Sequence, residues 1–291
     1  MNQHNYFKLL LIYIKIIVFI LTECKTEIKI KFNHLKLWHD KHINAIIKTM
    51  KIHPTTANFP GSPFVQAVSL AHSKLGHLDK AHMQLCPQQL GQLTQETSNK
   101  LLERWPETKF RLHANVQVLP KHHIFDASKN MQEDVHVSYI KSLKEINSHI
   151  KADIYSYHAG SRICSLEQMK ANTKALEDFL EVDVAVEGLY PEISNKWLIN
   201  SIDEYEWMAH NMFFALDLSH LQIVYQQSKK IIDKNWVLQM MEHPNCKEIH
   251  ISGNDGKHDN HQKISGEEWW LEILEKANTK AHVFTEENFK K

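Results

Sequence analysis

Seven short runs of apolar and β-branched residues recur between residues 81 and 285, and each has the length of one buried strand. Stretches with helical spacing separate them; Tyr139, Leu143 and Ile146, for example, fall on one face of a helix. Strands that alternate with helices run parallel, because each helix carries the chain back to the edge where the next strand begins. The predicted strands are Ala81–Leu85, Phe110–Val116, Ile154–Tyr157, Val182–Val186, Phe213–Leu218, Glu248–Ile251 and His282–Thr285.

The fold class that this alternation predicts is α/β, in the form of a (β/α)8 TIM barrel. The roughly 240 residues after Thr49 hold seven or eight strand–helix units, which suits one barrel of this kind. The position of the eighth strand stays open, because Phe64–Leu70 is a candidate that could equally be helical. A doubly wound open sheet is the alternative, but it would need a Gly-rich phosphate loop after an early strand, and the sequence has none.

Three of the helices are expected to begin at a serine that forms a capping box. In such a box the serine accepts a bond from the backbone of the third following residue, whose Glu or Gln side chain reaches back. The pairs are Ser165 with Gln168, Ser201 with Glu204, and Ser265 with Glu268. Each pair follows a predicted strand, which supports a repeated strand–helix unit.

The first 49 residues differ in composition from the rest of the chain, because all eight Gly and all eight Pro lie beyond them. Their apolar stretch, residues 9–21, is interrupted by Lys15 and is shorter than the roughly 20 residues of a membrane span. No small-residue cleavage site of a signal peptide follows it. Three interpretations of residues 1–49 stay open: a gene model that starts upstream of the true Met50, a targeting or anchoring segment, and a folded extension. We therefore take residues 50–291 as the barrel domain, and expect a cytoplasmic protein that contacts a membrane only if residues 1–25 are an anchor.

Charge and cysteine content exclude several classes of protein. Lys and Arg total 34 and Asp and Glu total 34, so the strong electrostatic signature of a general nucleic-acid or membrane-surface binder is missing. The four Cys are scattered and form no C-x-x-C pair, which argues against a disulfide scaffold and a zinc ribbon. Histidine is the unusual residue type, with 21 in the chain.

Imidazole and carboxylate groups collect at the carboxyl ends of the predicted strands. In a TIM barrel these ends meet at one rim, where catalytic groups lie. Such groups are ligands for zinc, manganese and iron. Four carboxylates and five imidazoles are too many for one ion, and they suit two or three ions that share a bridging carboxylate, an arrangement that activates water and holds a phosphoryl group. The predicted ligands are His113, His158, Glu187, Asp217, His220, His250, Asp259, His261 and Glu286.

The last of these ligands has a neighbour of the same type. Glu286 and Glu287 both follow the final strand. Alternation along a strand puts Glu286 on the same face as His282 and Phe284, and we therefore prefer it over Glu287.

The order of these residues resembles that of a known superfamily. Residues 80–291 resemble the xylose isomerase-like TIM barrels, and within them AP endonuclease family 2, whose member endonuclease IV carries a His-Pro-Gly-Ser motif. Here the corresponding stretch is His158-Ala159-Gly160-Ser161, with Ala in place of Pro. The Asp217-x-x-His220 pair, the His250 strand and the Asp259-x-His261 pair follow in the family's order.

The resemblance implies a site for up to three zinc ions, with manganese or iron as alternatives. His113 and His158 would hold the first ion, which Glu187 would bridge to the second. Asp217, His250 and Glu286 would complete the second site. The third ion would be held by His220, Asp259 and His261.

The sequence also departs from that family. The Gly-rich stretch after the bridging glutamate is replaced by residues 188–193, and Asn260 stands where the family has Arg beside the Asp-x-His pair. No loop that would enter DNA and turn out an abasic nucleotide is evident. Sugar isomerases and epimerases of the superfamily resemble only the subset Glu187, Asp217, His250 and Glu286, around a single metal.

Three functions remain in competition. The first is a metal-dependent phosphoester hydrolase resembling an AP endonuclease, acting on abasic DNA or a small phosphorylated compound. The second is a sugar or sugar-phosphate isomerase or epimerase, with Glu187 and Glu286 as catalytic acid and base. The third is a non-catalytic metal-binding barrel. No obligate protein partner is indicated, and Arg162 is expected to form a surface salt bridge in preference to a phosphate contact.

Overall fold

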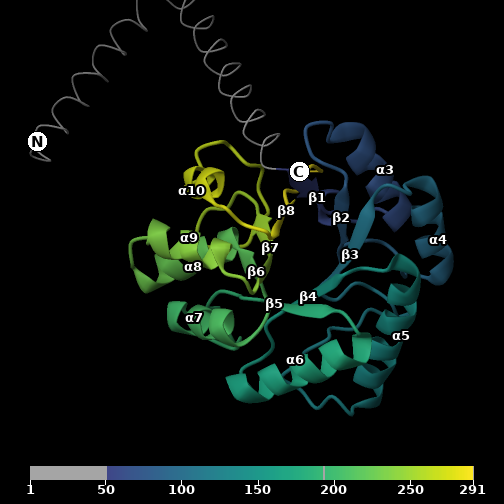
Figure 1. The fold of residues 1–291 in the computed structure, drawn as a ribbon, viewed down its shortest axis with the longest axis horizontal. Helices are drawn as coiled ribbons and strands as arrows, with labels where there is room; N and C mark the ends of the chain where they lie inside the picture. Colours follow the sequence, from purple (N-terminus) through teal and green to yellow (C-terminus); the bar gives the residue numbers. More distant parts are fainter. Residues whose placement is uncertain (1–50, 193, 291) are drawn as a thin grey trace, which may run out of the picture. The chain divides into compact units, whose positions relative to one another are not determined.

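In the computed structural model, residues 51–192 and 194–290 are described, so the predictions for residues 1–49 lie outside this part of the chain. Eight parallel strands form one sheet in the order β1-β8-β7-β6-β5-β4-β3-β2 (Figure 1). Their bounds are β1 Ile52–Pro54, β2 His82–Leu85, β3 Lys109–His113, β4 Ile154–His158, β5 Asp183–Glu187, β6 Phe214–Asp217, β7 Cys246–Ile251 and β8 His282–Thr285.

Seven parallel pairings join neighbouring strands in this order, from β1 with β8 round to β2 with β3. The ring is closed between β1 and β2 by an isolated parallel bridge from Thr55 to Gln84. The predicted (β/α)8 barrel is therefore confirmed, and its weakest seam lies between the first two strands.

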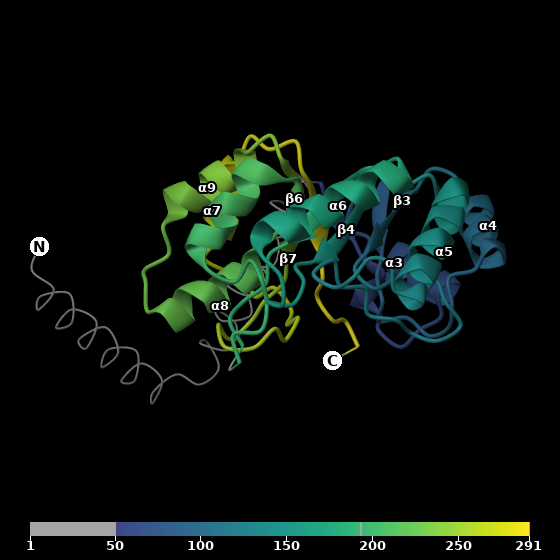
Figure 2. The same cartoon turned by 90° about the horizontal axis from the view of Figure 1, so that it is seen from below.

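The helices lie outside the strands in both views (Figures 1 and 2). Each packs an apolar stripe onto the sheet, so that the main core, with buried residues such as Val184, Leu216 and Ile249, lies between the two layers. Among the helices of the described ranges, none is long and apolar enough to cross a membrane. Their bounds are η1 Thr56–Asn58, α3 Phe64–Lys74, α4 Gln95–Arg104, α5 Asp134–Ile150, α6 Leu166–Leu180, α7 Ile202–Asn211, α8 Leu218–Ser228, α9 Lys234–Glu242 and α10 Leu271–Lys276.

The structure resolves the question of the eighth strand. The segment Phe64–Leu70 lies within helix α3, and the missing strand is β1, Ile52–Pro54. Three residues that include a proline offer too short a pattern to mark a strand in the sequence. Pairing with β8, from Ile52 opposite Val283 to Pro54 opposite Thr285, makes β1 a strand.

The capping predictions are only partly correct. Ser165 begins α6 and accepts a bond from the backbone of Gln168, as expected. Ser201 precedes α7 without a side-chain capping bond. The prediction for Ser265 is wrong, because α10 begins only at Leu271. The side chain of Glu268 does reach back and accept a bond from the backbone N–H of Ser265, as such a box predicts, but the hydroxyl of Ser265 accepts from the backbone of Glu267 and no helix follows directly.

The interior of the barrel is polar in its middle layer. Arg111, which is 1% exposed, points inward from β3. Its Nη1 lies 3.1 Å from Oε1 of Glu248 on β7, and its Nε lies 3.1 Å from Oδ1 of Asp153. Gln84 donates a bond of 2.8 Å to the other oxygen of Glu248. The buried charges are thus paired, as a low-dielectric interior requires.

Candidate metal centre

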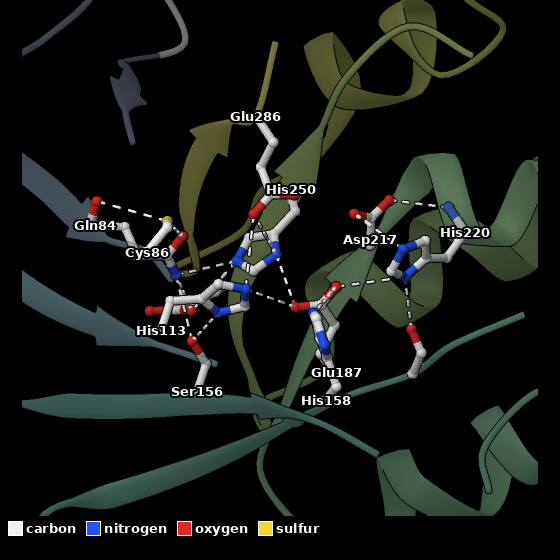
Figure 3. A network of polar contacts seen from close by, with 12 residues as sticks. Gln84, Cys86, His113, Ser156, His158, Glu187, Asp217, His220, His250 and Glu286 are labelled. Carbon is white, nitrogen blue, oxygen red and sulfur yellow. Dashed lines mark hydrogen bonds and ion pairs between the residues drawn. The ribbon is translucent and has the colours of Figure 1, made fainter. Parts of the chain in front are cut away.

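The carboxyl ends of the strands bring all nine predicted ligands to one rim of the barrel. Four of them are the last residues of consecutive strands, namely His113, His158, Glu187 and Asp217. His250 lies on β7, Glu286 directly follows β8, and His220 lies in the first turn of α8. Asp259 and His261 lie in the segment between β7 and α10. Figure 3 shows the side chains of the central members converging from separate strands.

Glu187 lies at the centre of the cluster and is 1% exposed. Its Oε2 is 3.1 Å from Nδ1 of His250 and 3.4 Å from Nε2 of His113. Its Oε1 is 3.3 Å from Nδ1 of His220 and 3.8 Å from Nε2 of His158. Burial alone would raise the pKa of Glu187, but the surrounding imidazoles, led by His250 and His158, hold it below its ordinary value.

Two of the imidazoles, those of His113 and His250, are held by a partner on the side away from this carboxylate. Nδ1 of His113 lies 2.9 Å from Oγ of Ser156, whereas Nδ1 of His220 donates to the carbonyl of Gly188 at 2.9 Å on the same side as Glu187, which leaves its Nε2 facing Asp259. Nε2 of His250 lies 3.3 Å from Oε2 of Glu248. Histidines that bind metals are typically oriented in this way, because the outer bond fixes which nitrogen faces the ion.

The two remaining buried carboxylates close the cluster. Asp217 caps helix α8, and its Oδ1 accepts bonds from the backbone N–H groups of Ser219 and His220. Oε1 of Glu286 lies 3.7 Å from both Nδ1 of His250 and Nε2 of His113. Burial raises the pKa of Glu286 to about 7. A carboxyl group with this pKa would be protonated in part of the metal-free protein at neutral pH.

Glu287 faces away from the cluster. Its Oε1 accepts a bond of 2.7 Å from the backbone N–H of Ile264, and its Oε2 accepts one of 2.9 Å from Oγ1 of Thr285. The geometry therefore favours Glu286 as the ligand and gives Glu287 the role of anchoring a loop.

Asp259 and His261 form the outer part of the cluster. Oδ2 of Asp259 lies 3.4 Å from Nε2 of His220 and 3.2 Å from Nε2 of His261. Nδ1 of His261 lies 3.5 Å from Oε2 of Glu286. Burial disfavours the charged imidazole, but Asp259 and Glu286 outweigh it and raise the pKa of His261 to about 9. His261 has a φ of 44°, so the chain is held in a left-handed conformation at this position.

The donor atoms fit divalent metal ions. Both oxygens of Glu187, Oδ1 of Asp259, and the Nδ1 atoms of His250 and His261 are buried and make no hydrogen bond of regular geometry, although Nδ1 of His250 lies within ion-pair distance of Glu187. Such orphaned polar atoms are costly unless an ion or water satisfies them. The zinc, manganese and iron that the sequence suggests all take this donor set.

Three compact triplets of potential ligand atoms occur within the described residues. They are His113 with Glu187 and His250, Glu187 with Asp217 and His220, and Asp217 with His250 and Glu286. Glu187, Asp217 and His250 each belong to two triplets. His158, Asp259 and His261 belong to none, and His113 groups with His250 where the resemblance implied His158. The nine ligand assignments and their division among ions stay predictions.

Sequence reasoning missed the residues that orient the ligands. His250 is held by Glu248 and Gln84, and His113 is held by Ser156. A signal was present, because Glu248 lies two residues before His250 and a strand directs alternate residues to the same face. Glu248 also opens the predicted apolar strand, and at that position its inward-facing role beside His250 is not evident from the sequence.

Arg162 forms the surface salt bridge expected of it. Its Nη1 lies 2.7 Å from Oε1 of Glu204, and its Nη2 donates to Oε2 of Glu204 at 2.9 Å and to Asn200 at 3.1 Å. The bidentate contact occupies the guanidinium group. Arg162 therefore offers no free cation to a phosphate.

A cavity of about 400 Å³ opens beside His158, His220 and Asp259. Aromatic and apolar side chains line much of it, among them Phe125, Leu189, Tyr190 and Trp197. Of the described residues that line it, Lys129 is the only Lys or Arg. Its size suits a small molecule, and Lys129 is joined in the lining by three carboxylates, Asp126, Glu192 and Asp259.

No family model matches the sequence, and no curated protein matches it. Solved structures do match the fold. A protein described as a putative xylose isomerase from Rhodospirillum rubrum aligns with a TM-score of 0.60 at 12% identity, over 82% of this chain and 90% of that chain. An AP endonuclease of family 2 from Brucella melitensis aligns with a TM-score of 0.56 at 12% identity, over 82% of this chain and 93% of that chain.

A D-tagatose 3-epimerase-like protein aligns equally well, with a TM-score of 0.56 at 13% identity over 82% of this chain and 90% of that chain. Identities this low establish the architecture and leave the chemistry open. The fold of this chain is that of the xylose isomerase-like TIM barrels, as the order of its strand-end residues predicted.

Proposed function

We propose that this chain is a divalent-metal-dependent hydrolase that acts on a small phosphorylated substrate with a multinuclear site. One observation carries the proposal. Buried Glu187 is shared between one triplet with His113 and His250 and another with Asp217 and His220. A carboxylate with a separate ligand set on each oxygen is the arrangement that bridges two ions.

Ions at such a site lower the pKa of bound water and stabilise negative charge on a phosphoryl group. The chain itself supplies the remaining functions. His113 and His250 are held with a defined nitrogen toward Glu187, and the bond of His220 to Gly188 leaves its Nε2 toward Asp259, so the ligands require little reorganisation on metal binding. Lys129 provides a positive charge in the cavity, and Tyr190 and Trp197 provide flat walls for an apolar or cyclic group.

The cavity favours a small substrate over abasic DNA. Duplex DNA requires several cations that track its phosphates, whereas Lys129 is the only Lys or Arg among the described residues that line this cavity. A nucleotide, a sugar phosphate or a similar phosphoester would match the volume, with its phosphoryl group at the metal ions and Lys129.

A sugar isomerase or epimerase is the second candidate. A compact triplet of their own is formed by Asp217, His250 and Glu286. Nδ1 of His250, which faces Glu286, also lies 3.1 Å from Oε2 of Glu187. One ion held by these residues would leave Glu187 and Glu286 on either side of a substrate as proton acceptor and donor. The similar structures include an epimerase-like protein and an AP endonuclease, so the fold is compatible with both chemistries.

Metal content and activity together test the proposal. The full chain, purified without chelator, is measured for metal by mass spectrometry and assayed on phosphomonoesters, phosphodiesters, an abasic oligonucleotide and a set of ketoses. We expect at least two ions per chain and hydrolysis of a small phosphoester, both lost in Glu187→Gln. Glu267→Gln, which alters an exposed glutamate, serves as the control.

Other outcomes would contradict the proposal. One ion per chain with turnover of a ketose would establish the isomerase instead. Bound metal without turnover of any substrate would favour a non-catalytic metal-binding barrel. Cleavage of the abasic oligonucleotide alone would overturn the preference for a small substrate.

A further inference from the structure

Three histidines meet at the amino-terminal rim of the barrel, on the opposite side from the candidate metal centre. His53 lies on β1, and His82 and His282 are the first residues of β2 and β8. The ring centroids of His82 and His282 are 3.9 Å apart, and that of His53 is 5.0 Å from His82 and 5.4 Å from His282. Barrel closure alone brings these residues together, because 229 positions separate His53 from His282.

Hydrogen bonding leaves nitrogen atoms of this cluster available. Nδ1 of His53 donates to the carbonyl of Asp79 at 3.0 Å, which leaves its Nε2 as the unprotonated nitrogen. That Nε2 accepts a long bond of 3.5 Å from Nδ1 of His282, which a bound ion would replace. Nδ1 of His82 is buried and has no hydrogen-bond partner. A bond from one ring nitrogen to a backbone carbonyl is typical of a histidine whose other nitrogen binds a metal.

Charges of both signs surround the cluster. Arg111 lies in the layer above, where Glu248 and Asp153 both pair with it, and the lysines near the rim, among them Lys51 and Lys109, are opposed by Asp79 and Asp153. Burial lowers the pKa of His53, of His82 to about 4, and of His282 to about 3. The three imidazoles are therefore neutral at physiological pH, and only neutral imidazole binds a metal.

An open cavity lies against the cluster. It measures about 500 Å³, and all three histidines line it together with two carboxylates, Asp79 and Glu275, and two lysines, Lys51 and Lys280. The three histidines are not one of the compact ligand triplets of the described residues, and the rings of His82 and His282 are tilted by 38° to each other, so these two side chains must rotate for three nitrogens to point at one ion. Both side chains are only partly buried, which leaves room for this rotation.

We propose that His53, His82 and His282 form a second divalent-cation site, selective for zinc-like ions, at the amino-terminal mouth of the barrel. Three imidazoles with a fourth position open to the cavity match the tetrahedral preference of zinc. The ion would join β1, β2 and β8 across the seam where a single bridge, Thr55 to Gln84, closes the ring. The site is independent of the proposed function, because none of its ligands belongs to the carboxyl-end rim.

The first test counts zinc in the full chain after equilibration at low micromolar free zinc. The variant is the double substitution His82→Gln and His282→Gln, since glutamine keeps a polar side chain but binds zinc poorly. We expect the variant to lose one zinc ion per chain, and to lose the increase in Tm that this ion gives the wild type. His122→Ala removes an exposed histidine outside both clusters and should retain every ion. Equal zinc content and equal Tm increase in the double variant would overturn the proposal.

A second test uses only wild-type protein, so its result does not depend on whether a variant folds. Wild-type protein is modified with diethyl pyrocarbonate with and without zinc, and peptides are mapped by mass spectrometry. We expect zinc to protect His82 and His282, whose peptides are distinct from those of the carboxyl-end histidines, while His122 reacts equally in both samples. Unchanged modification of His82 and His282 would refute the site, even if the carboxyl-end histidines are protected.

Discussion

Oε2 of Glu248 lies 3.3 Å from Nε2 of His250, two residues further along strand β7. This contact directs Nδ1 of His250 toward Glu187, 3.1 Å away. The same carboxylate pairs with Arg111. Glu248 thus links the polar middle layer of the barrel to the candidate metal centre.

Replacing the carboxylate of Glu248 is expected to affect both metal affinity and stability. Glu248→Gln removes the anion that orients His250, so metal affinity should fall roughly 10- to 100-fold, as for other outer partners of ligating histidines. It also leaves Arg111 with only Asp153, at a cost of roughly 3 kcal/mol in the free energy of unfolding. Zinc titration and urea denaturation measure the two effects separately, with Glu267→Gln as the exposed control. Full affinity in a destabilised variant would show that Glu248 serves the fold alone.

Neighbouring glutamates at the end of β8 provide a matched pair of substitutions. Glu286→Gln should reduce metal content, because its carboxylate faces His250 and His113. Glu287→Gln should retain the metal and lose about 1 kcal/mol of stability, because it weakens the bonds to Ile264 and Thr285. Metal analysis and thermal denaturation of both variants check this. The reverse pattern would make Glu287 the ligand.

Acid should weaken the salt bridge between Arg162 and Glu204. Burial opposes ionisation of Glu204, but Arg162 and the backbone of Asn200 hold its pKa below the ordinary 4.5. A lowered pKa in the folded state means that the stabilisation is fully present above pH 4.5 and is lost as the pH falls through the folded-state pKa. Arg162→Gln should therefore cost about 0.2–1 kcal/mol at neutral pH and progressively less in acid. Urea midpoints compared with wild type between neutral pH and pH about 3 measure this difference; a constant difference would exclude the ion pair as its cause.

Gly188 follows the central Glu187 in a space that admits no side chain. A Cβ at this position would lie 2.4 Å from the ring of Tyr205, whose hydroxyl donates to the carbonyl of Leu189. Gly188→Ala should therefore lower stability by roughly 1–3 kcal/mol through overpacking and should shift the carbonyl that holds His220. The matched control is Gly76→Ala, where nothing lies within 4 Å of the added methyl group. Thermal denaturation with metal analysis checks both variants, and equal behaviour would show that Tyr205 moves aside at little cost.

Several features of the candidate site could be predicted from the sequence because they depend on local periodicity. His113, Glu187 and Asp217 each end an apolar run, and parallel strands carry their last residues to one rim. Alternation along β8 also separated Glu286 from Glu287, since neighbouring strand residues face opposite sides. The barrel itself followed from the same alternation of strand and helix.

Other features depend on contacts between distant segments and were decided only by the tertiary structure. β1 is three residues long and is a strand because β8 lies beside it. The grouping of His113 with His250, and the role of Glu248, follow from which side chains cross the barrel. His53, His82 and His282 are unremarkable in the chain and meet only when the ring closes. Local sequence determines which face a side chain occupies, whereas closure of the sheet determines which faces meet.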